Sequence, residues 1–105
     1  MANVDKYVKK AYYKWMKILM RKEAKKQLKL IPDHIYRKYL YWIDLLDTVG
    51  LKEARKYKGF HDEPLRGKRK GQRSVRLSKA YRAIYQEVDS GFEVIEIIEV
   101  NKHDY

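Results

Sequence analysis

The pattern of apolar and polar positions divides the chain into a helical first half and a second half rich in short strands. Between Pro32 and Gly50, apolar residues recur every three or four positions, which predicts a helix with one apolar stripe. Pro32 suits a first helical turn, Asp33 complements the helix dipole, and Gly50 marks the expected end. The stripe, which we interpret as core rather than as a base-stacking surface, consists of Ile35, Tyr39, Trp42, Ile43 and Leu46.

Shorter elements flank this helix. The run Lys14 to Met20 is apolar enough to open a sheet, although it could equally begin the next helix. Residues Arg21 to Leu30 are good helix formers and predict a short basic helix before Pro32. Leu51 to Tyr57 could add one further turn.

From Gln72 onward the periodicity changes to β-branched segments. We expect strands at Arg73 to Leu77, Tyr81 to Val88 and Phe92 to Val100. The last has apolar residues on both faces, which suits a central strand. Helices followed by an antiparallel meander predict an α+β domain.

The turn around Lys79 makes a specific geometric prediction. If three residues form the loop, Leu77 opposes Tyr81 and Arg76 opposes Arg82 on the face away from the apolar side chains. Like charges facing each other across two strands are unfavourable, so an anion such as phosphate would stabilise the pair. The alternative is two solvated arginines.

The distribution of charge strengthens the case for a polyanionic partner. The net charge is +11, and the segment from Lys52 to Arg82 is densely basic, whereas Lys102 is the only Lys or Arg from Ala83 onward. This asymmetry predicts one positive face on a folded domain. Candidate RNA-binding residues lie in the segment Leu65 to Arg73 and near the C-terminus: Arg66, Lys68, Arg69, Lys70, Arg73 and Lys102. A loop that is merely solvated is the alternative.

Size and composition limit the remaining possibilities. The 105 residues suit one domain spanning 1–105, with residues 1–13 as an N-terminal extension. No Cys is present, which excludes disulfides and thiolate chemistry. No run approaches the roughly 20 apolar residues of a membrane span, so we expect a cytoplasmic protein without membrane contact.

Histidines are the natural candidates for proton transfer in a ribonuclease without a metal, because their unperturbed pKa lies near neutrality. Of the three, His34 lies in the second predicted helix and is expected at its surface. His61 and His103 are better placed, in a loop and in the C-terminal tail. His61 lies beside Asp62 and Glu63, but adjacent residues rarely converge on one ion, so we expect no metal and no cofactor.

Three segments resemble the corresponding stretches of RelE/HigB-type toxins of the RelE/ParE superfamily: HDEPLRGKRKGQRSVRL, YRAIY and EVNKHDY. The resemblance implies a RelE-like fold, in which N-terminal helices pack on a twisted antiparallel sheet of three to four strands. It also implies an endoribonuclease (mRNA interferase) that enters the ribosomal A site. Cleavage would proceed through attack of a 2′-hydroxyl on the adjacent phosphate, without a metal.

The resemblance assigns roles to particular residues. Arg66 and Lys68 fall in the basic loop of the family, and Arg76 and Arg82 fall where such toxins carry phosphate-binding arginines. In the tail, His103 precedes Asp104 and Tyr105, an order that departs from the family and leaves the identities of acid and base open. The resulting catalytic candidates are His103, Arg82, Arg76, Tyr105 and His61.

The expected partners are the ribosome, mRNA and a cognate antitoxin, the last a small DNA-binding protein with an acidic inhibitory segment. Two other functions compete with the nuclease. A ParE-like toxin would keep the fold and bind gyrase, and a non-catalytic domain would bind RNA or the ribosome without cutting. His103 beside a dense basic loop favours the nuclease.

Overall fold

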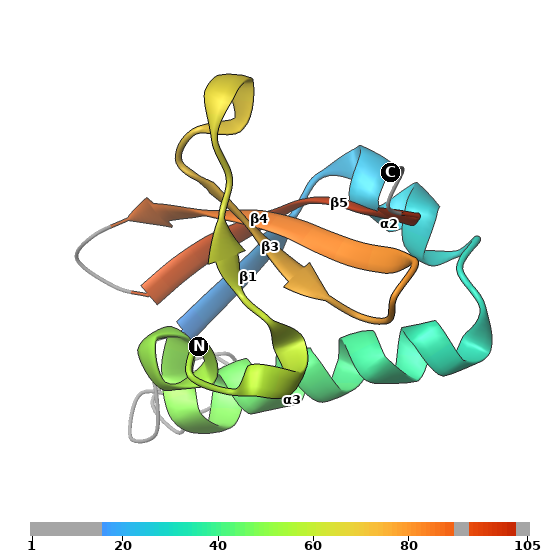
Figure 1. The fold of residues 1–105 in the computed structure, drawn as a ribbon, viewed down its shortest axis with the longest axis horizontal. Coiled ribbons are helices and arrows are strands. Elements are labelled where there is room, and N and C mark those ends of the chain that lie inside the picture. The colour runs from blue at the N-terminus through green and yellow to red at the C-terminus, as the bar shows by residue number, and fades with distance from the viewer. Residues whose placement is uncertain (1–15, 90–92, 103–105) are drawn as a thin grey trace, which may run out of the picture.

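The computed structural model describes residues 16–89 and 93–102 of the chain. Two helices precede most of the sheet, and two short 3₁₀ turns interrupt the later strands (Figure 1). In chain order the elements are β1 (Met16–Met20), α2 (Lys22–Leu28), α3 (Asp33–Ala54), η1 (Lys58–Phe60), β2 (Glu63–Pro64), η2 (Gly67–Arg69), β3 (Gln72–Arg76), β4 (Tyr81–Asp89) and β5 (Glu93–Lys102).

The sheet has five strands in the order β1-β5-β4-β3-β2. The predicted α+β class is confirmed, and β5 lies inside the sheet as expected. The number and direction of the strands need correction, because β1 pairs with β5 in parallel and the sheet is therefore mixed. The fifth strand is β2, whose Pro64 is tolerated because β2 forms an edge of the sheet.

Helix α3 covers one face of the sheet (Figure 1). Four residues of the predicted stripe are buried, namely Ile35, Tyr39, Trp42 and Leu46, while Ile43 is only partly buried. The ring centroids of Trp42 and Tyr85 lie 5.4 Å apart. The regular helix breaks at Gly50, where φ is 83°, and one further turn continues to Ala54. The predicted break and extra turn are both confirmed.

The hairpin between β3 and β4 has the predicted register. Arg76 pairs with Arg82, and the amide of Leu77 donates to the carbonyl of Tyr81 at 2.9 Å. The Ser78 hydroxyl accepts from the amides of Ala80 and Tyr81, both at 3.1 Å. Serine stabilises such turns by bonding nearby backbone, so the local sequence determines the register.

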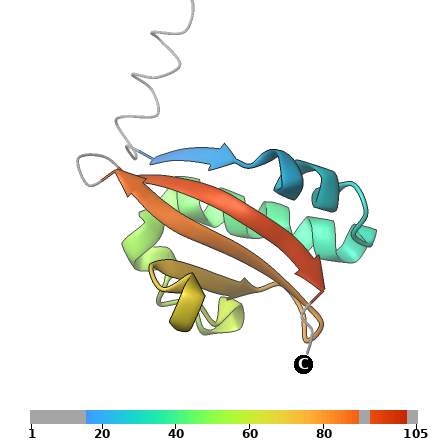
Figure 2. The ribbon, with the colours of Figure 1, turned by 90° about the horizontal axis from the view of Figure 1, so that it is seen from above.

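The opposite face of the sheet, which we call the open face, is the one onto which Figure 2 looks. Side chains alternate along a strand, so residues next to the buried Val75 and Ala83 point to this face. On β3, β4 and β5 the open face carries Gln72, Ser74, Arg76, Arg82, Ile84, Gln86, Glu96, Glu99 and Asn101.

Helix α2 lies along the outer edge of β5 beyond the end of β1. The Arg21 amide donates to the carbonyl of Ile97 at 2.9 Å, and the Gln27 side chain accepts from the Val100 amide at 2.8 Å. This edge of β5 is therefore protected by a side chain as well as by a strand. Within residues 16–89 and 93–102, no helix is both long and apolar enough to cross a membrane.

Candidate functional site

The open face presents two arginines side by side, Arg76 and Arg82, which we call the arginine row. Arg76 and Arg82 are paired across β3 and β4 and alternate with core residues, so both point away from α3. Arg76 is exposed and Arg82 partly exposed. Neither side chain has a hydrogen bond or ion pair within the described part of the chain. Two unneutralised guanidinium groups at one level of a sheet form a site that an anion would stabilise.

The next strand continues this row. Asn101 on β5 lies opposite Arg82 and shares the open face with it, whereas Lys102 lies opposite Tyr81, so its side chain starts on the face toward α3. Lys102 is exposed. The tail candidates His103 and Tyr105, together with Asp104, lie outside the described residues. In the sequence they directly follow Lys102, the last residue of β5.

The basic loop is formed by residues 65–71 and contains the η2 turn. Gly67 and Gly71 have φ of 65° and 94°, values that favour glycine, so these residues allow the loop its two sharp changes of direction. The side chains of Arg66, Lys68 and Lys70 are exposed and have no bonded partner among the described residues. These three cations are available to an external polyanion.

Arg69, by contrast, is directed back onto the sheet. Its guanidinium donates to Gln72 Oε1 at 2.8 Å and to Glu99 Oε1 and Oε2 at 2.8 and 2.9 Å. Gln72 is on β3 and Glu99 on β5, so the side chain of Arg69 crosses β4 on the open face. The Asn101 amide also donates to Glu99 Oε2 at 3.3 Å, which links this bridge to the arginine row.

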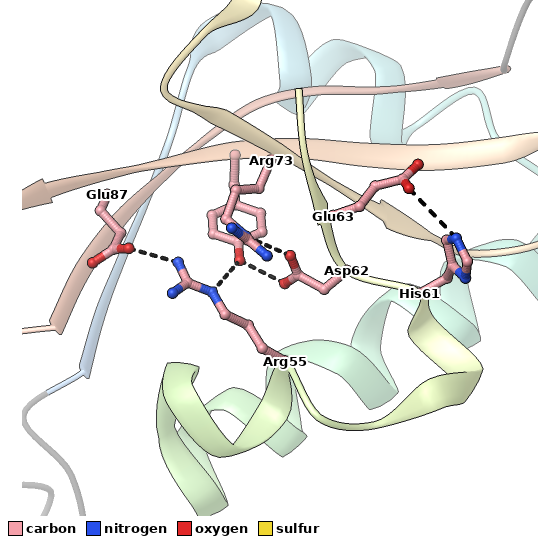
Figure 3. A network of polar contacts seen from close by, with 7 residues as sticks. Arg55, His61, Asp62, Glu63, Arg73 and Glu87 are labelled. Carbon is pink, nitrogen blue, oxygen red and sulfur yellow. Dashed lines mark hydrogen bonds and ion pairs between the residues drawn. The ribbon is translucent and has the colours of Figure 1, made fainter. Parts of the chain in front are cut away.

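The Arg73 side chain does not lie with those of the basic loop. Its side chain lies on the face toward α3, where Nε donates to Asp62 Oδ1 at 2.6 Å (Figure 3). The Asp62 side chain is only 2% exposed. We therefore leave Arg73 out of the proposed RNA-contacting residues, because its charge is already neutralised inside the fold.

Asp62 is the centre of a larger polar network. The Tyr85 hydroxyl donates to Asp62 Oδ2 at 2.6 Å, and Arg55 donates to Tyr85 at 3.4 Å and to Glu87 at 2.6 Å. Burial and the neighbouring Asp62 charge raise the pKa of Tyr85 above its ordinary value, so the phenol keeps its proton. Partial burial lowers the pKa of Arg55, but its bonds to Tyr85 and Glu87 raise it overall. The network joins the end of α3 to β3 and β4.

This network should contribute strongly to stability. Asp62→Ala leaves Arg73 and Tyr85 without their acceptor, so we expect the free energy of unfolding to fall by about 3 kcal/mol. Asp44→Ala is the matched control on the exposed side of α3, with an expected change within about 0.5 kcal/mol. Urea titration of both variants measures the difference, and equal values for the two would show that the network is not stabilising.

His61 lies just outside the network and points away from it (Figure 3). Its backbone is left-handed, with φ of 46° and ψ of 53°, and its Nε2 lies 3.5 Å from Glu63 Oε2. Glu63 pairs with Ser74, two residues before Arg76, and His61 precedes Glu63 by two. His61 therefore lies toward the same end of the sheet as the arginine pair, with its side chain 55% exposed.

Sequence reasoning missed the acidic members of these clusters. Glu99 and Asp62 were not among the candidates, although each holds an arginine that was. The sequence contains no signal that singles out Glu99, because the same strand also carries Glu93 and Glu96. For Asp62 the partners Arg73 and Tyr85 are 11 and 23 positions away, and no local pattern connects them.

Comparison with solved structures identifies the same fold in bacterial and archaeal toxins. A YoeB/ParE toxin from Agrobacterium tumefaciens superposes with a TM-score of 0.69 at 21% identity, over 85% of this chain and 100% of that one. The archaeal RelE-RelB complex from Pyrococcus horikoshii OT3 gives a TM-score of 0.63 at 27% identity, over 83% of this chain and 93% of that one.

A third similar structure comes from the DinJ-YafQ toxin-antitoxin complex of E. coli, with a TM-score of 0.65 at 21% identity over 85% of this chain and 93% of that one. No protein-family model matches the sequence, and no curated protein matches it. The similarity therefore rests on the fold.

Proposed function

Because this chain has the fold of the RelE/ParE superfamily of toxins from toxin-antitoxin systems, we propose that it is the toxin of such a pair and a ribosome-dependent mRNA endoribonuclease. The observation that carries the proposal is the pair Arg76 and Arg82 on the open face, unneutralised by any other described residue. A phosphodiester placed between them would receive two planar, two-pronged donors. The exposed Arg66, Lys68 and Lys70 would contact flanking phosphates.

The proposed reaction needs only proton transfer and charge stabilisation. The ribose 2′-oxygen attacks the adjacent phosphorus and loses its proton to a base, while the bond from phosphorus to the 5′-oxygen breaks and that oxygen gains a proton. The products are a 2′,3′-cyclic phosphate and a 5′-hydroxyl. Arg76 and Arg82 would stabilise the negative charge that builds on the phosphate oxygens.

The proton-transfer groups are proposed from the C-terminal tail and from the loop that carries His61. His103 is our first choice for acid or base, with Tyr105 beside it in the tail. His61 is the alternative, since it lies toward the same end of the sheet and its ring is accessible. Lys102 lies opposite Tyr81, so its side chain starts on the face toward α3; we propose that it contacts RNA at the end of the sheet rather than beside the reacting phosphate.

The proposed inhibitor is an acidic segment of a cognate antitoxin laid over the open face. A net charge of +11 and a cluster of unneutralised cations favour such a partner. We propose that the antitoxin is a small DNA-binding protein. By covering Arg76 and Arg82 it would exclude mRNA.

Purified protein should leave free mRNA largely intact and cut the same mRNA in translating ribosomes, because exposed cations and one or two titratable side chains form a minimal catalytic site. Reverse-transcription mapping of the two reactions measures this. Rapid cutting of free mRNA would contradict ribosome dependence. No cutting in either reaction would contradict the nuclease and favour a ParE-like gyrase-binding toxin or a non-catalytic RNA-binding domain.

A further inference from the structure

The open face, which we propose binds RNA, carries an acidic residue near its centre. Glu99 lies opposite Ile84, and Asn101, two residues further along β5, lies opposite Arg82. Glu99 is thus in the row next to the arginine pair. A carboxylate so close to a polyanion site is unfavourable unless a cation neutralises it, and Arg69 supplies that cation through two bonds of 2.8 and 2.9 Å.

The same bridge fixes the basic loop to the sheet. Within the described residues, every side-chain hydrogen bond from the loop to the sheet is made by Arg69, to Gln72 and to Glu99. The remaining bonds of the loop are backbone bonds: Leu65 to Gln72 at 2.9 Å, and two within the turn itself. Glu99 is also the anchor point furthest from the base of the loop, because β4 lies between it and β3.

The burial of Ile84 agrees with this geometry. Gln72 pairs with Gln86, and Glu99 pairs with Ile84, so a side chain that joins Gln72 to Glu99 crosses β4 between Gln86 and Ile84. Ile84 points to the open face and is nevertheless only 5% exposed. Arg69 therefore ties the loop, which rises from the sheet in Figure 1, to the middle of the open face.

We propose that Glu99 is a positioning residue for RNA binding, which acts through Arg69 to hold the basic loop over the open face. In this arrangement the exposed Lys68 and Lys70 contact the same RNA that Arg76 and Arg82 bind. The loop is already ordered before RNA binds. The inference rests on the proposed function, since it takes single-stranded RNA as the ligand. Ordering a loop in advance increases affinity by removing that entropic cost from binding.

For removal of Glu99, the proposal predicts a change in RNA affinity opposite to the one expected from charge alone. Removing a carboxylate from a surface that binds a polyanion should strengthen binding through space. If Glu99 holds the loop, its removal should weaken binding, because Arg69 and its neighbours lose their fixed positions.

Glu96 provides a matched control. It is an acidic residue on the same strand and the same face, but it is held by Arg21 at 3.2 Å and by Gln86 at 2.9 Å, with no bond to the loop. Its side chain is 27% exposed and that of Glu99 is 25% exposed. Glu96→Gln and Glu99→Gln therefore remove the same charge from similar surroundings.

The test measures binding of a short fluorescent single-stranded RNA to the full-length chain by anisotropy. Glu99→Gln should raise Kd roughly three- to tenfold, the range expected when a few side chains must be ordered on binding. Glu96→Gln should leave Kd unchanged or lower it. Equal or tighter binding by Glu99→Gln would overturn the proposal.

A charge swap separates positioning from loss of stability. The double variant Arg69→Glu with Glu99→Arg restores the ion pair with its direction reversed and should bind more tightly than Arg69→Glu alone, close to the wild-type Kd. Melting temperatures verify that each protein is folded. If Glu99→Gln does not fold, the swap alone decides, and failure to recover binding contradicts the proposal.

Cleavage on ribosomes distinguishes this inference from the proposed function. Glu99→Gln should raise KM and leave kcat nearly unchanged, because the bridge acts on binding and touches no reacting atom. If the wild-type chain binds RNA with the expected pattern among variants but does not cut, the nuclease proposal fails and the positioning role stands. If it cuts and Glu99→Gln has wild-type KM and Kd, only the positioning role fails.

Discussion

Arg82→Ala is expected to lower the rate of mRNA cleavage on ribosomes by on the order of 10²-fold or more, because it removes a fixed charge where negative charge builds on the phosphate. The Arg82 side chain has no partner within the described residues, so the substitution breaks no observed side-chain bond and the fold should survive. Single-turnover cleavage on programmed ribosomes, with ribosome binding measured separately, gives the rate.

Arg82→Lys is the informative companion to this variant. Lysine keeps the charge but loses the planar fork of donors, so the rate should recover only in part. Arg37→Ala is the matched control, since Arg37 is an exposed arginine of α3 and α3 packs on the other face of the sheet. A wild-type rate for Arg82→Ala would show that the arginine row does not bind the reacting phosphate.

His103→Ala is expected to lower the cleavage rate by roughly 10²- to 10⁴-fold, the usual contribution of a general acid or base. Ribosome binding should change little, because the proposed role of His103 is proton transfer rather than RNA contact. The same single-turnover assay measures the rate, and its pH dependence in the wild-type chain should contain a group titrating near neutrality that the variant lacks.

His61→Ala is the control for the other accessible imidazole. If His103→Ala cuts at the wild-type rate and His61→Ala does not, the proton-transfer role belongs to the loop between η1 and β2. If neither histidine matters, Tyr105 is the remaining candidate of the original set.

The parts of the fold that sequence reasoning predicted correctly are those determined by neighbours along the chain. The α3 stripe follows from helical spacing, and the pairing of Arg76 with Arg82 follows from a three-residue turn whose serine bonds its own backbone. In both cases the physical cause lies within a few residues, so a pattern in the sequence carries the information.

The parts that were missed depend on contacts between distant segments. The parallel pairing of β1 with β5 joins Met16 to Glu93 across most of the chain, and nothing in either segment specifies direction. The short strand β2 contains a proline, and its sequence predicted a loop. Its place at an edge, where one ladder suffices, is a property of the whole sheet.

The candidate site was predicted in its charge but not in its internal pairing. All the loop cations looked equivalent in sequence, whereas in the structure Arg69 and Arg73 are held by Glu99 and Asp62. Local density of basic residues cannot show which of them a distant carboxylate neutralises. That information requires the fold, which brings residues 30 and 11 positions apart into contact.

The central claim is that the open face promotes cleavage of mRNA by attack of the RNA's own 2′-hydroxyl on the adjacent phosphate. It is tested most directly by sequencing RNA ends after brief induction of the wild-type chain and of Arg82→Ala. We predict new breaks within translated reading frames, with 2′,3′-cyclic phosphate and 5′-hydroxyl ends, that are nearly absent with Arg82→Ala. Breaks with 5′-phosphate ends, or equal numbers of breaks with both proteins, would contradict the account.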